Sequence, residues 1–169
     1  LLQLAGGAVY DENGKAQIVH DQKLEVLDQL IEEANGQPVL VFYNYKHELD
    51  RLQARYPQAV HVKEENVVKR WNAKELPILL ANPASAGHGL NLQFGGHIAI
   101  WYSPTWNLEF FQQANKRLHR RGQTEPVLIH TLAAKGTIDE RIYDIVLRDK
   151  EAGQNALLEA VKARIKEVT

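Results

Sequence analysis

Hydrophobic and polar residues alternate along this chain with two different spacings. Continuous apolar runs of four or five residues, such as Val39 to Tyr43, are typical of strands that are buried on both faces of a parallel sheet. Between these runs, apolar residues recur every three or four positions, which indicates amphipathic helices. The segment from Asp21 to Ala34 has this spacing, and Asn35-Gly36 is a typical helix stop directly after it.

This alternation predicts an α/β domain with a mostly parallel sheet and helices on both faces. The expected strands are Val39–Tyr43, Ala59–Val62, Pro77–Ala81, His97–Tyr102 and Val127–Leu132. The expected helices are Asp21–Ala34, Tyr45–Tyr56, Glu65–Trp71, Asn107–Arg121, Thr137–Arg148 and Asn155–Lys166. A small hairpin, Ala8–Tyr10 and Lys15–Val19 around Asn13-Gly14, precedes them. We therefore divide the chain into a lead-in at 1–20, the α/β domain at 21–150 and a helical extension at 151–169.

The composition narrows the classes of function. With 169 residues, of which 44% are hydrophobic, the chain is long enough for one domain with a full core. Its net charge of −1 argues against a generally basic surface, so contact with a polyanion must come from a local patch. The absence of cysteine excludes disulfides, thiolate zinc sites and cysteine nucleophiles. No apolar run approaches the roughly 18 residues that cross a membrane, so we expect no membrane partner.

The segment from Gln113 to Gln123 carries the strongest candidate chemistry. In a continuous helix, Arg117 lies four residues after Gln113 and Arg120 three residues further on, so the three side chains would project from one face. A planar, permanently charged guanidinium suits a developing phosphate charge. Two guanidiniums beside an amide therefore predict a clamp for the transition state of phosphoryl transfer.

A simpler interpretation of the same segment is a solvated, basic helix end. Cations are favourable near a helix C-terminus, and Gly122 is a suitable cap. The cations concerned are Lys116, Arg117, Arg120 and Arg121. The segment alone leaves both interpretations open.

Three loops follow predicted strands at the edge of the sheet where ligands bind in open α/β folds. They are residues 44–46, 82–92 and 103–107. The middle loop has small residues at five positions, so a phosphate or ribose can approach its backbone closely. The alternative for that loop is a tight surface turn without a ligand. It is not a dinucleotide fingerprint, because its Gly-x-Gly lacks a third glycine at the required spacing.

Four motifs give the chain a specific resemblance. Gly87-His-Gly-Leu-Asn91-Leu resembles the fifth motif of superfamily-two helicases. Gln113 to Gln123 matches their sixth motif, Q-x-x-x-R-x-H-R-x-G-Q, at every defined position. Trp106-Asn107 resembles the pair that precedes the sixth motif, and Lys135 to Arg141 resembles the K-G-T-I-E-E-R segment that follows it. The block from Leu79 to Arg141 thus resembles the second RecA-like lobe of the Swi/Snf-like branch, whose members are DNA-dependent ATPases.

The resemblance also has its departures. Val39 to Tyr43 fits the strand of the fourth motif only loosely. Leu108 stands where the family usually has proline after Trp-Asn, and the fifth-motif loop is one residue longer than usual. The implied fold is a RecA-like, three-layer α/β domain. We expect a bacterial or phage member and an intracellular location, which is the cytoplasm in a bacterial or phage-infected cell.

Motifs that are missing define the role that the resemblance implies. Neither G-x-x-x-x-G-K-[ST] nor an acidic strand-end motif of the D-E-x-H kind occurs, so the chain itself cannot cradle the β- and γ-phosphates or hold magnesium. Because the chain starts at Leu1 and contains no methionine, we interpret it as a piece of a longer protein. The resemblance implies that an N-terminal RecA-like lobe of the same protein binds ATP with magnesium, and that this lobe supplies arginine fingers.

The resemblance also implies roles for individual residues. Arg117 and Arg120 would be the catalytic arginine fingers, and Gln113 would position the γ-phosphate or the attacking water. The nucleotide-contacting residues would be Gly87, Gly89 and Asn91. Contacts to the DNA backbone, independent of sequence, would come from Asn44, Tyr45, Lys46, Ser85 and Trp106. For Tyr45 and Trp106, packing in the core is the alternative.

Two classes of function remain. The leading one is the second motor lobe of an ATP-dependent DNA helicase or translocase, inactive on its own. The alternative is a non-catalytic, helicase-like α/β module that binds nucleic acid or protein. The intact sixth motif favours the motor lobe, because a degenerate lobe is free to lose an arginine. A stand-alone nucleotide enzyme such as a dehydrogenase is excluded by the missing phosphate-binding loop.

Overall fold

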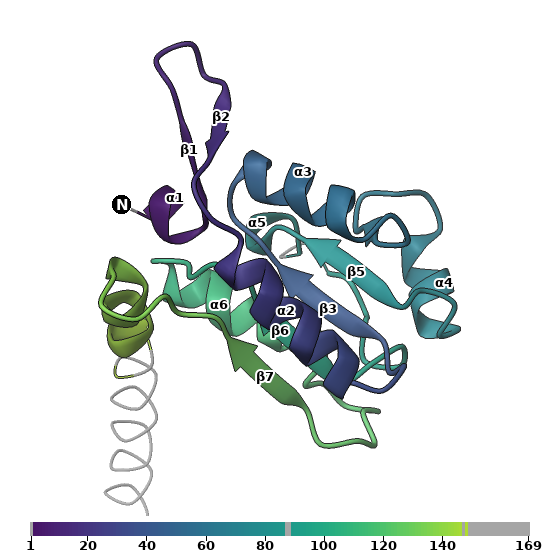
Figure 1. Ribbon diagram of the computed structural model, residues 1–169. Coiled ribbons are helices and arrows are strands. Elements are labelled where there is room, and N and C mark those ends of the chain that lie inside the picture. The colour runs from purple at the N-terminus through teal and green to yellow at the C-terminus, as the bar shows by residue number, and fades with distance from the viewer. Residues whose placement is uncertain (1, 87–88, 147, 149–169) are drawn as a thin grey trace, which may run out of the picture.

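A computed structural model describes residues 2–86, 89–146 and 148 of the chain. Its centre is a five-stranded parallel sheet with the strand order β4-β5-β3-β6-β7 (Figure 1). The strands are β3 (Val39–Phe42), β4 (Val60–His61), β5 (Ile78–Ala81), β6 (Ile98–Trp101) and β7 (Leu128–Thr131). The chain builds the sheet outward from β3, with β5 on one side of it and β6 on the other. The prediction of an α/β domain with a mostly parallel sheet is confirmed.

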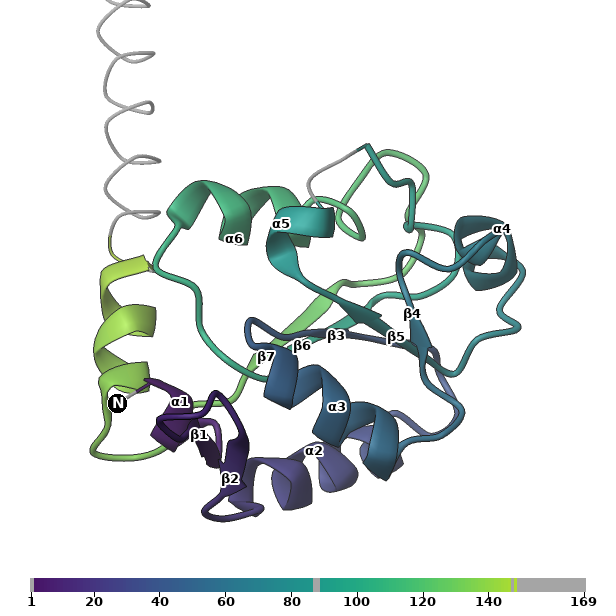
Figure 2. The same cartoon turned by 90° about the horizontal axis from the view of Figure 1, so that it is seen from above.

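Helices cover both faces of the sheet (Figure 2). On one face lie α2 (Gln22–Glu33) and α3 (Lys46–Arg55), and on the other lie α5 (Pro83–Ala86) and α6 (Leu108–Asn115). The short helix α4 (Val67–Asn72) connects β4 to β5. Residues 138–146, after β7, form a further helix. The expected three-layer arrangement is therefore present.

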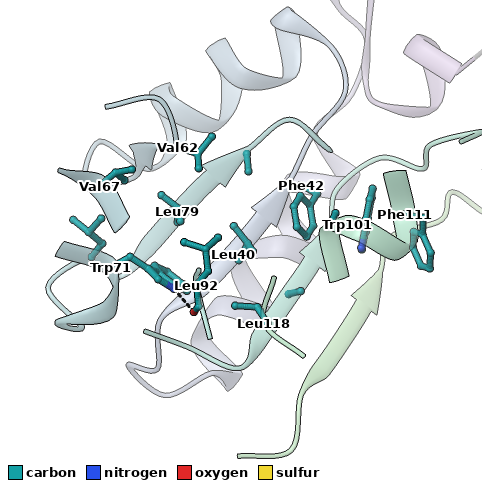
Figure 3. Close-up of a cluster of buried hydrophobic side chains, with 14 of the residues drawn as sticks. Leu40, Phe42, Val62, Val67, Trp71, Leu79, Leu92, Trp101, Phe111 and Leu118 are labelled. Carbon is teal, nitrogen blue, oxygen red and sulfur yellow. Dashed lines mark hydrogen bonds between the residues drawn. The ribbon is translucent and has the colours of Figure 1, made fainter. Parts of the chain in front are cut away.

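The strands supply side chains to two hydrophobic cores. Leu40 and Phe42 of β3 pack with residues of α4 and α6 in one core, which Figure 3 shows. Val39 and Val41 point to the opposite face and pack against α2 and α3. All four side chains are at most 1% exposed, and full burial of each such side chain stabilises the fold by about 1.5–3 kcal/mol. Burial on both faces explains why the strand is apolar at every position.

The N-terminal segment begins with α1 (Leu2–Ala5), which the sequence analysis did not anticipate. The antiparallel hairpin of β1 (Ala8–Tyr10) and β2 (Ala16–Ile18) follows and confirms the predicted hairpin. In its turn, Gly14 has a φ of +74°, which favours glycine. The Asp11 carboxylate accepts hydrogen bonds from two N–H groups of this turn, at 2.8 and 3.0 Å.

The helix predicted over Asn107–Arg121 is wrong at its C-terminal end, because α6 ends at Asn115. Beyond that point the Arg117 N–H donates to the carbonyl oxygen of Ala114, three residues back instead of four, at 3.0 Å. The tighter turn accompanies the burial of Leu118, which is 0% exposed and belongs to the core shared with α6. The helical spacing of apolar residues thus continues past Asn115, although the α-helix itself does not.

The loop at residues 82–92 also differs from the expectation, because it contains α5. The Asn82 side chain accepts the N–H two residues ahead at 3.1 Å, and Pro83 occupies the first helical position, where proline is favoured. The helix predicted over Thr137–Arg148 is observed over residues 138–146. The helix predicted over Asn155–Lys166 lies outside the described residues.

Candidate functional site

The two helicase-like motifs meet through Arg120 and Asn91. Arg120 Nη1 donates a hydrogen bond to Asn91 Oδ1 at 2.5 Å. The Asn91 carbonyl oxygen accepts from Asn72 Nδ2, and the Leu92 carbonyl oxygen accepts from Trp71 Nε1 (Figure 3), both at 2.8 Å. Arg120 therefore contacts a loop whose backbone is fixed by two side chains of α4.

Gln123 fixes the far end of the arginine segment to the same loop. Its Nε2 donates to the carbonyl oxygens of Gln93 and Gly96, both at 2.9 Å. Gly122 has a φ of +100° and makes the turn that precedes Gln123. Because α6 ends well before it, at Asn115, Gly122 does not cap this helix.

Both interpretations of the arginine segment assumed that the helix continues to Arg121, and this assumption is wrong. Gln113, Arg117 and Arg120 do not share one helical face, because α6 ends before both arginines. A basic helix end is also absent, since Lys116 stands at the C-cap and the last turn of α6 holds no basic residue. The tertiary contact with Asn91 sets the position of Arg120.

The two arginines influence each other electrostatically. Burial lowers the pKa of Arg117, and the positive charge of Arg120 lowers it further. Within the described part of the chain, Arg120 takes part in no salt bridge, and its partner Asn91 is a neutral amide. An amide holds a guanidinium in place and leaves its charge intact. The segment therefore presents a local concentration of positive charge that suits an anion.

Gln113 lies on α6 and forms a hydrogen bond within that helix. Its Nε2 donates to Glu109 Oε1 of the same helix at 2.7 Å. Asn107 caps the N-terminus of α6, because its side-chain oxygen accepts a hydrogen bond from the Phe110 N–H at 2.9 Å. At the other end of α6, Asn115 Oδ1 accepts from Trp101 Nε1 of β6 at 2.9 Å. The Asn115–Trp101 bond thus ties the C-terminal end of α6 to the sheet.

The predicted nucleotide loop is described only in part, because Gly87 lies outside the described residues. Gly89 has a φ of +69°, a conformation that side chains disfavour. Among the residues that the structure describes, none has an atom within 4 Å of a Cβ added there. Backbone conformation, and not crowding by these residues, therefore favours glycine at this position.

A depression of about 270 Å³ lies at the carboxyl ends of β3, β5 and β6. Because β5 and β6 lie on opposite sides of β3, this is the topological switch point where open α/β sheets bind ligands. Asn44, Tyr45 and Trp106 line the depression together. Trp106 is 54% exposed, so it is not a core residue. Tyr45 is half-buried and its ring stacks on His47, with 5.5 Å between ring centroids.

The other two predicted DNA contacts lie on neighbouring helices. Lys46 is exposed at the first position of α3, and Ser85 is half-buried in α5. Neither residue lines the depression itself. The structure therefore gathers three of the five residues in one hollow and places two beside it.

Residues 22–122 match a family model described as the helicase conserved C-terminal domain. The chain belongs to this family. It is 40% identical over 171 residues to protein p41 of Acyrthosiphon pisum secondary endosymbiont phage 1, an alignment that covers 97% of this chain and 37% of p41. It is 34% identical to the chromatin-remodeling ATPase INO80 of Mycosarcoma maydis and 29% identical to that of Saccharomyces cerevisiae, covering 79% and 84% of this chain.

The helicase C-terminal domain described here spans only part of these relatives, namely 37% of p41 and 8% and 10% of the two INO80 proteins. Its fold is similar to a crystal structure of the C-terminal part of the Fun30 ATPase domain, with a TM-score of 0.65 and 23% identity over 77% of this chain and 46% of that one. The chain is thus related to Snf2-family ATPases and has the RecA-like fold, which confirms the resemblance inferred from the motifs.

A buried carboxylate that the sequence analysis missed shapes the depression of this helicase lobe. Glu48 is 0% exposed, and its Oε2 accepts from the Asn44 and Tyr45 N–H groups at 2.9 and 3.1 Å. Ser103 Oγ donates to the same oxygen at 2.8 Å. The Asn44 amide in turn reaches the carbonyl oxygen of Pro104 at 2.8 Å. The loops after β3 and β6 are thereby joined.

The surroundings of Glu48 raise its pKa overall, although its hydrogen bonds oppose this shift. Burial raises the pKa, and the hydrogen bonds from the two N–H groups and from Ser103 lower it. The sequence held one indication of this role for Glu48. It stands three residues after the N-cap Tyr45, which is the spacing of a capping box. Tyrosine at the N-cap position concealed that signal, since a capping box normally begins with serine or threonine.

The second missed feature of the helicase lobe is a buried ion pair between Lys23 and Asp139. Lys23 Nζ lies 2.5 Å from Asp139 Oδ2, and the two side chains are 6% and 0% exposed. Lys23 also donates to the carbonyl oxygen of Tyr102 at 3.1 Å. The pair fixes the helix at residues 138–146 to α2. The two residues are too far apart in sequence for local patterns to connect them.

The described residues contain neither a membrane-spanning helix nor a metal-binding cluster. None of the helices in the described part of the chain has the length and apolar character needed to cross a bilayer. The described residues also contain no group of three or more histidine, aspartate or glutamate side chains arranged to hold a metal ion.

Proposed function

We propose that this chain is the second motor lobe of an ATP-dependent DNA helicase or translocase. An N-terminal RecA-like lobe of the same protein holds ATP, and Arg117 and Arg120 reach its phosphates across the interface between the lobes. The observation that carries the proposal is the hydrogen bond from Arg120 to the neutral amide of Asn91. This contact positions a guanidinium and leaves its full charge for a partner.

The chemistry of phosphoryl transfer fits this arrangement. The transition state spreads negative charge over the phosphoryl oxygens, and planar guanidiniums stabilise that charge through paired hydrogen bonds. The lowered pKa of Arg117 reflects partial desolvation and the nearness of another cation. Attraction to an anion is stronger in such surroundings than in water. A phosphate placed between Arg117 and Arg120 also relieves the repulsion between them.

The remaining nucleotide contacts have supporting roles. Gln113 positions the γ-phosphate or the attacking water, which requires its amide to leave Glu109 when the first lobe docks. Gly87, Gly89 and Asn91 contact the nucleotide. The positive φ of Gly89, and the absence of described residues within 4 Å of a Cβ added there, support close approach of a ribose or phosphate.

In this proposal the first lobe would hold magnesium together with ATP, and the metal would supply positive charge beside the phosphates. The sequence of this chain contains no phosphate-binding loop, and its described residues hold no metal-binding cluster. We therefore expect the chain of 169 residues on its own to hydrolyse no ATP above background. Robust, DNA-stimulated hydrolysis by this chain alone would contradict the two-lobe proposal.

The depression at the strand ends is the proposed DNA face. Exposed Trp106 and half-buried Tyr45 offer flat surfaces to the duplex, and Lys46 and Ser85 beside them offer a charge and a hydroxyl to phosphates. The Asn44 amide is bound within the loops, so Asn44 acts chiefly by shaping this face. Backbone contacts of this kind position DNA without reading its sequence.

Substitution of Asn91 tests the arginine-finger role. In the two-lobe protein, Asn91→Asp places a carboxylate against Arg120 and neutralises the finger, whereas Asn91→Ala removes the support and keeps the charge. We expect kcat at saturating ATP and DNA to fall further in Asn91→Asp than in Asn91→Ala. Gln53→Glu, at an exposed position of α3, provides the same change from amide to carboxylate away from the site.

This comparison distinguishes the effect of the Arg120 charge from the effect of the hydrogen bond that positions Arg120. If Asn91→Ala loses as much turnover as Asn91→Asp, or more, the neutral amide matters only as a support and the charge argument fails. If Gln53→Glu loses turnover to the same degree, the effect is one of net charge and not of the site. Neither result is compatible with the proposal as stated.

A separate experiment tests the DNA face. The double substitution Lys46→Ala and Ser85→Ala in the two-lobe protein should lower the ratio of DNA-stimulated to DNA-free ATP hydrolysis. Because few phosphates are contacted, DNA binding by this lobe should depend only weakly on salt concentration. Lys15→Ala, in the hairpin turn, is the control for the loss of one exposed positive charge. An equal loss of both rates would assign Lys46 and Ser85 to the fold or the ATP cleft.

A further inference from the structure

Phe94 is a large aromatic side chain that remains 54% exposed beside the arginine segment. A Cβ added to Gly122 would lie 3.0 and 3.2 Å from two carbon atoms of the Phe94 ring, so the ring covers Gly122. Gly122 follows Arg120 by two residues, and Phe94 follows Asn91 by three. The ring therefore lies next to the point where the two helicase motifs join.

The backbone on both sides of Phe94 is held firmly. Gln123 Nε2 binds the carbonyl oxygens of Gln93 and Gly96, which flank the short Phe94 turn. On the inner side, a Cβ on Gly95 would lie 2.4 Å from the indole nitrogen of fully buried Trp71, so backbone and indole are in close contact. An exposed aromatic ring thus stands on a rigid support, which is the arrangement that stacking requires.

The ring forms one wall of a hollow of about 360 Å³. Lys74, Thr124 and Glu125 contribute polar groups to the other walls. The volume falls within the range of small-ligand sites. Gln37 and His97, which precede β3 and β6, also line the hollow, so it opens at the amino ends of the strands. That edge is opposite the depression proposed for DNA, and a DNA base is therefore not its natural occupant.

We propose that Phe94 is the stacking surface for the base of the nucleotide whose phosphates meet Arg117 and Arg120. This inference rests on the proposed function and adds a base subsite to it. The Arg120–Asn91 contact fixes the phosphate end, and the hollow beside Gly122 receives the nucleoside end. An aromatic ring stacks on the flat face of a base. The ligand class is a purine nucleoside triphosphate, because a purine offers the larger stacking surface.

The test compares ligands with and without a base in the two-lobe protein. Phe94→Ala should raise the KM for ATP about tenfold and leave kcat within about twofold, since stacking on one base has roughly this effect. The inhibition constant of magnesium tripolyphosphate, which has no base, should stay unchanged. Phe94→Trp should restore the KM. Val26→Ala, an exposed apolar position on α2, is the control.

Two results would overturn the inference. An unchanged KM for ATP in Phe94→Ala means that no base stacks there. A parallel weakening of tripolyphosphate inhibition means that Phe94 supports the arginine loop or the contact between lobes. Arg120→Ala in the same assay separates this inference from the proposed function. Loss of kcat in Arg120→Ala with an unchanged KM in Phe94→Ala rejects only the stacking role, whereas retained kcat in Arg120→Ala rejects the proposed function.

Discussion

Replacing Lys23 by methionine should strongly destabilise this domain. The methionine side chain has a similar length and keeps the apolar contacts of the lysine stem, but it removes the ammonium group. That group lies 2.5 Å from Asp139 Oδ2 and 3.1 Å from the Tyr102 carbonyl oxygen, in surroundings where the Lys23 and Asp139 side chains are 6% and 0% exposed. Lys23→Met therefore leaves the Asp139 carboxylate buried without its counter-charge.

The expected loss is about 3–5 kcal/mol of unfolding free energy, the range observed when one partner of a buried ion pair is removed. Asp139 keeps a hydrogen bond from the Ala134 N–H at 3.2 Å, which compensates for only part of the charge. A loss of this size is a large fraction of the roughly 5–15 kcal/mol that stabilises a typical domain. The helix at residues 138–146 should be the first element to detach from α2.

Urea denaturation of the 169-residue chain at neutral pH measures this loss. Arg55→Met is the matched control, because Arg55 pairs with Asp28 at the surface, where such pairs contribute little. The double variant Lys23→Met/Asp139→Asn should be more stable than Lys23→Met, since it removes the unpaired charge. Equal losses in Lys23→Met and Arg55→Met, or no recovery in the double variant, would mean that the buried ion pair does not determine this loss of stability.

Two further predictions concern single positions in the fold. Gly95→Ala should lower the free energy of unfolding by about 1–3 kcal/mol, because its Cβ would lie 2.3 Å from the Trp71 carbonyl oxygen; an unchanged urea midpoint would contradict this close packing. Burial raises the pKa of Glu48 above its ordinary value of 4.5, so folding favours the protonated form. This stabilising contribution is complete below pH 4.5 and is lost as the pH rises through the raised pKa. The stability advantage of the wild type over Glu48→Gln should therefore shrink above pH 4.5, and parallel stability–pH curves for the two proteins would be inconsistent with the raised pKa.

The sheet was predictable because its signals are local. Each central strand is buried on both faces, so a run such as Val39 to Phe42 is apolar at every position. The end of α2 was predictable because Asn35 and Gly36 both adopt positive φ values, which these residue types tolerate. Motif spacing also singled out Asn91 and Arg120, which the structure brings into contact.

The features that sequence reasoning missed depend on tertiary contacts. Leu118 continues the helical spacing of α6, yet its burial in the core accompanies a tighter turn after Asn115. Glu48 and Lys23 are charged residues that a sequence pattern assigns to the surface, and only their partners in distant segments explain why they are buried. The position of Phe94 over Gly122 likewise depends on two loops that meet only in the folded chain.

The effect of Arg120→Ala on hydrolysis and on ATP binding in the two-lobe protein tests whether this arginine acts on the phosphates. An arginine finger acts on charge that develops in the transition state, so kcat should fall by about 10³–10⁵ while the affinity for ATP changes far less. Arg117→Lys should also be severe, because an ammonium group does not reproduce the planar fork of the guanidinium. Near-normal turnover in Arg120→Ala would mean that this arginine does not act on the phosphates, and it would contradict the account.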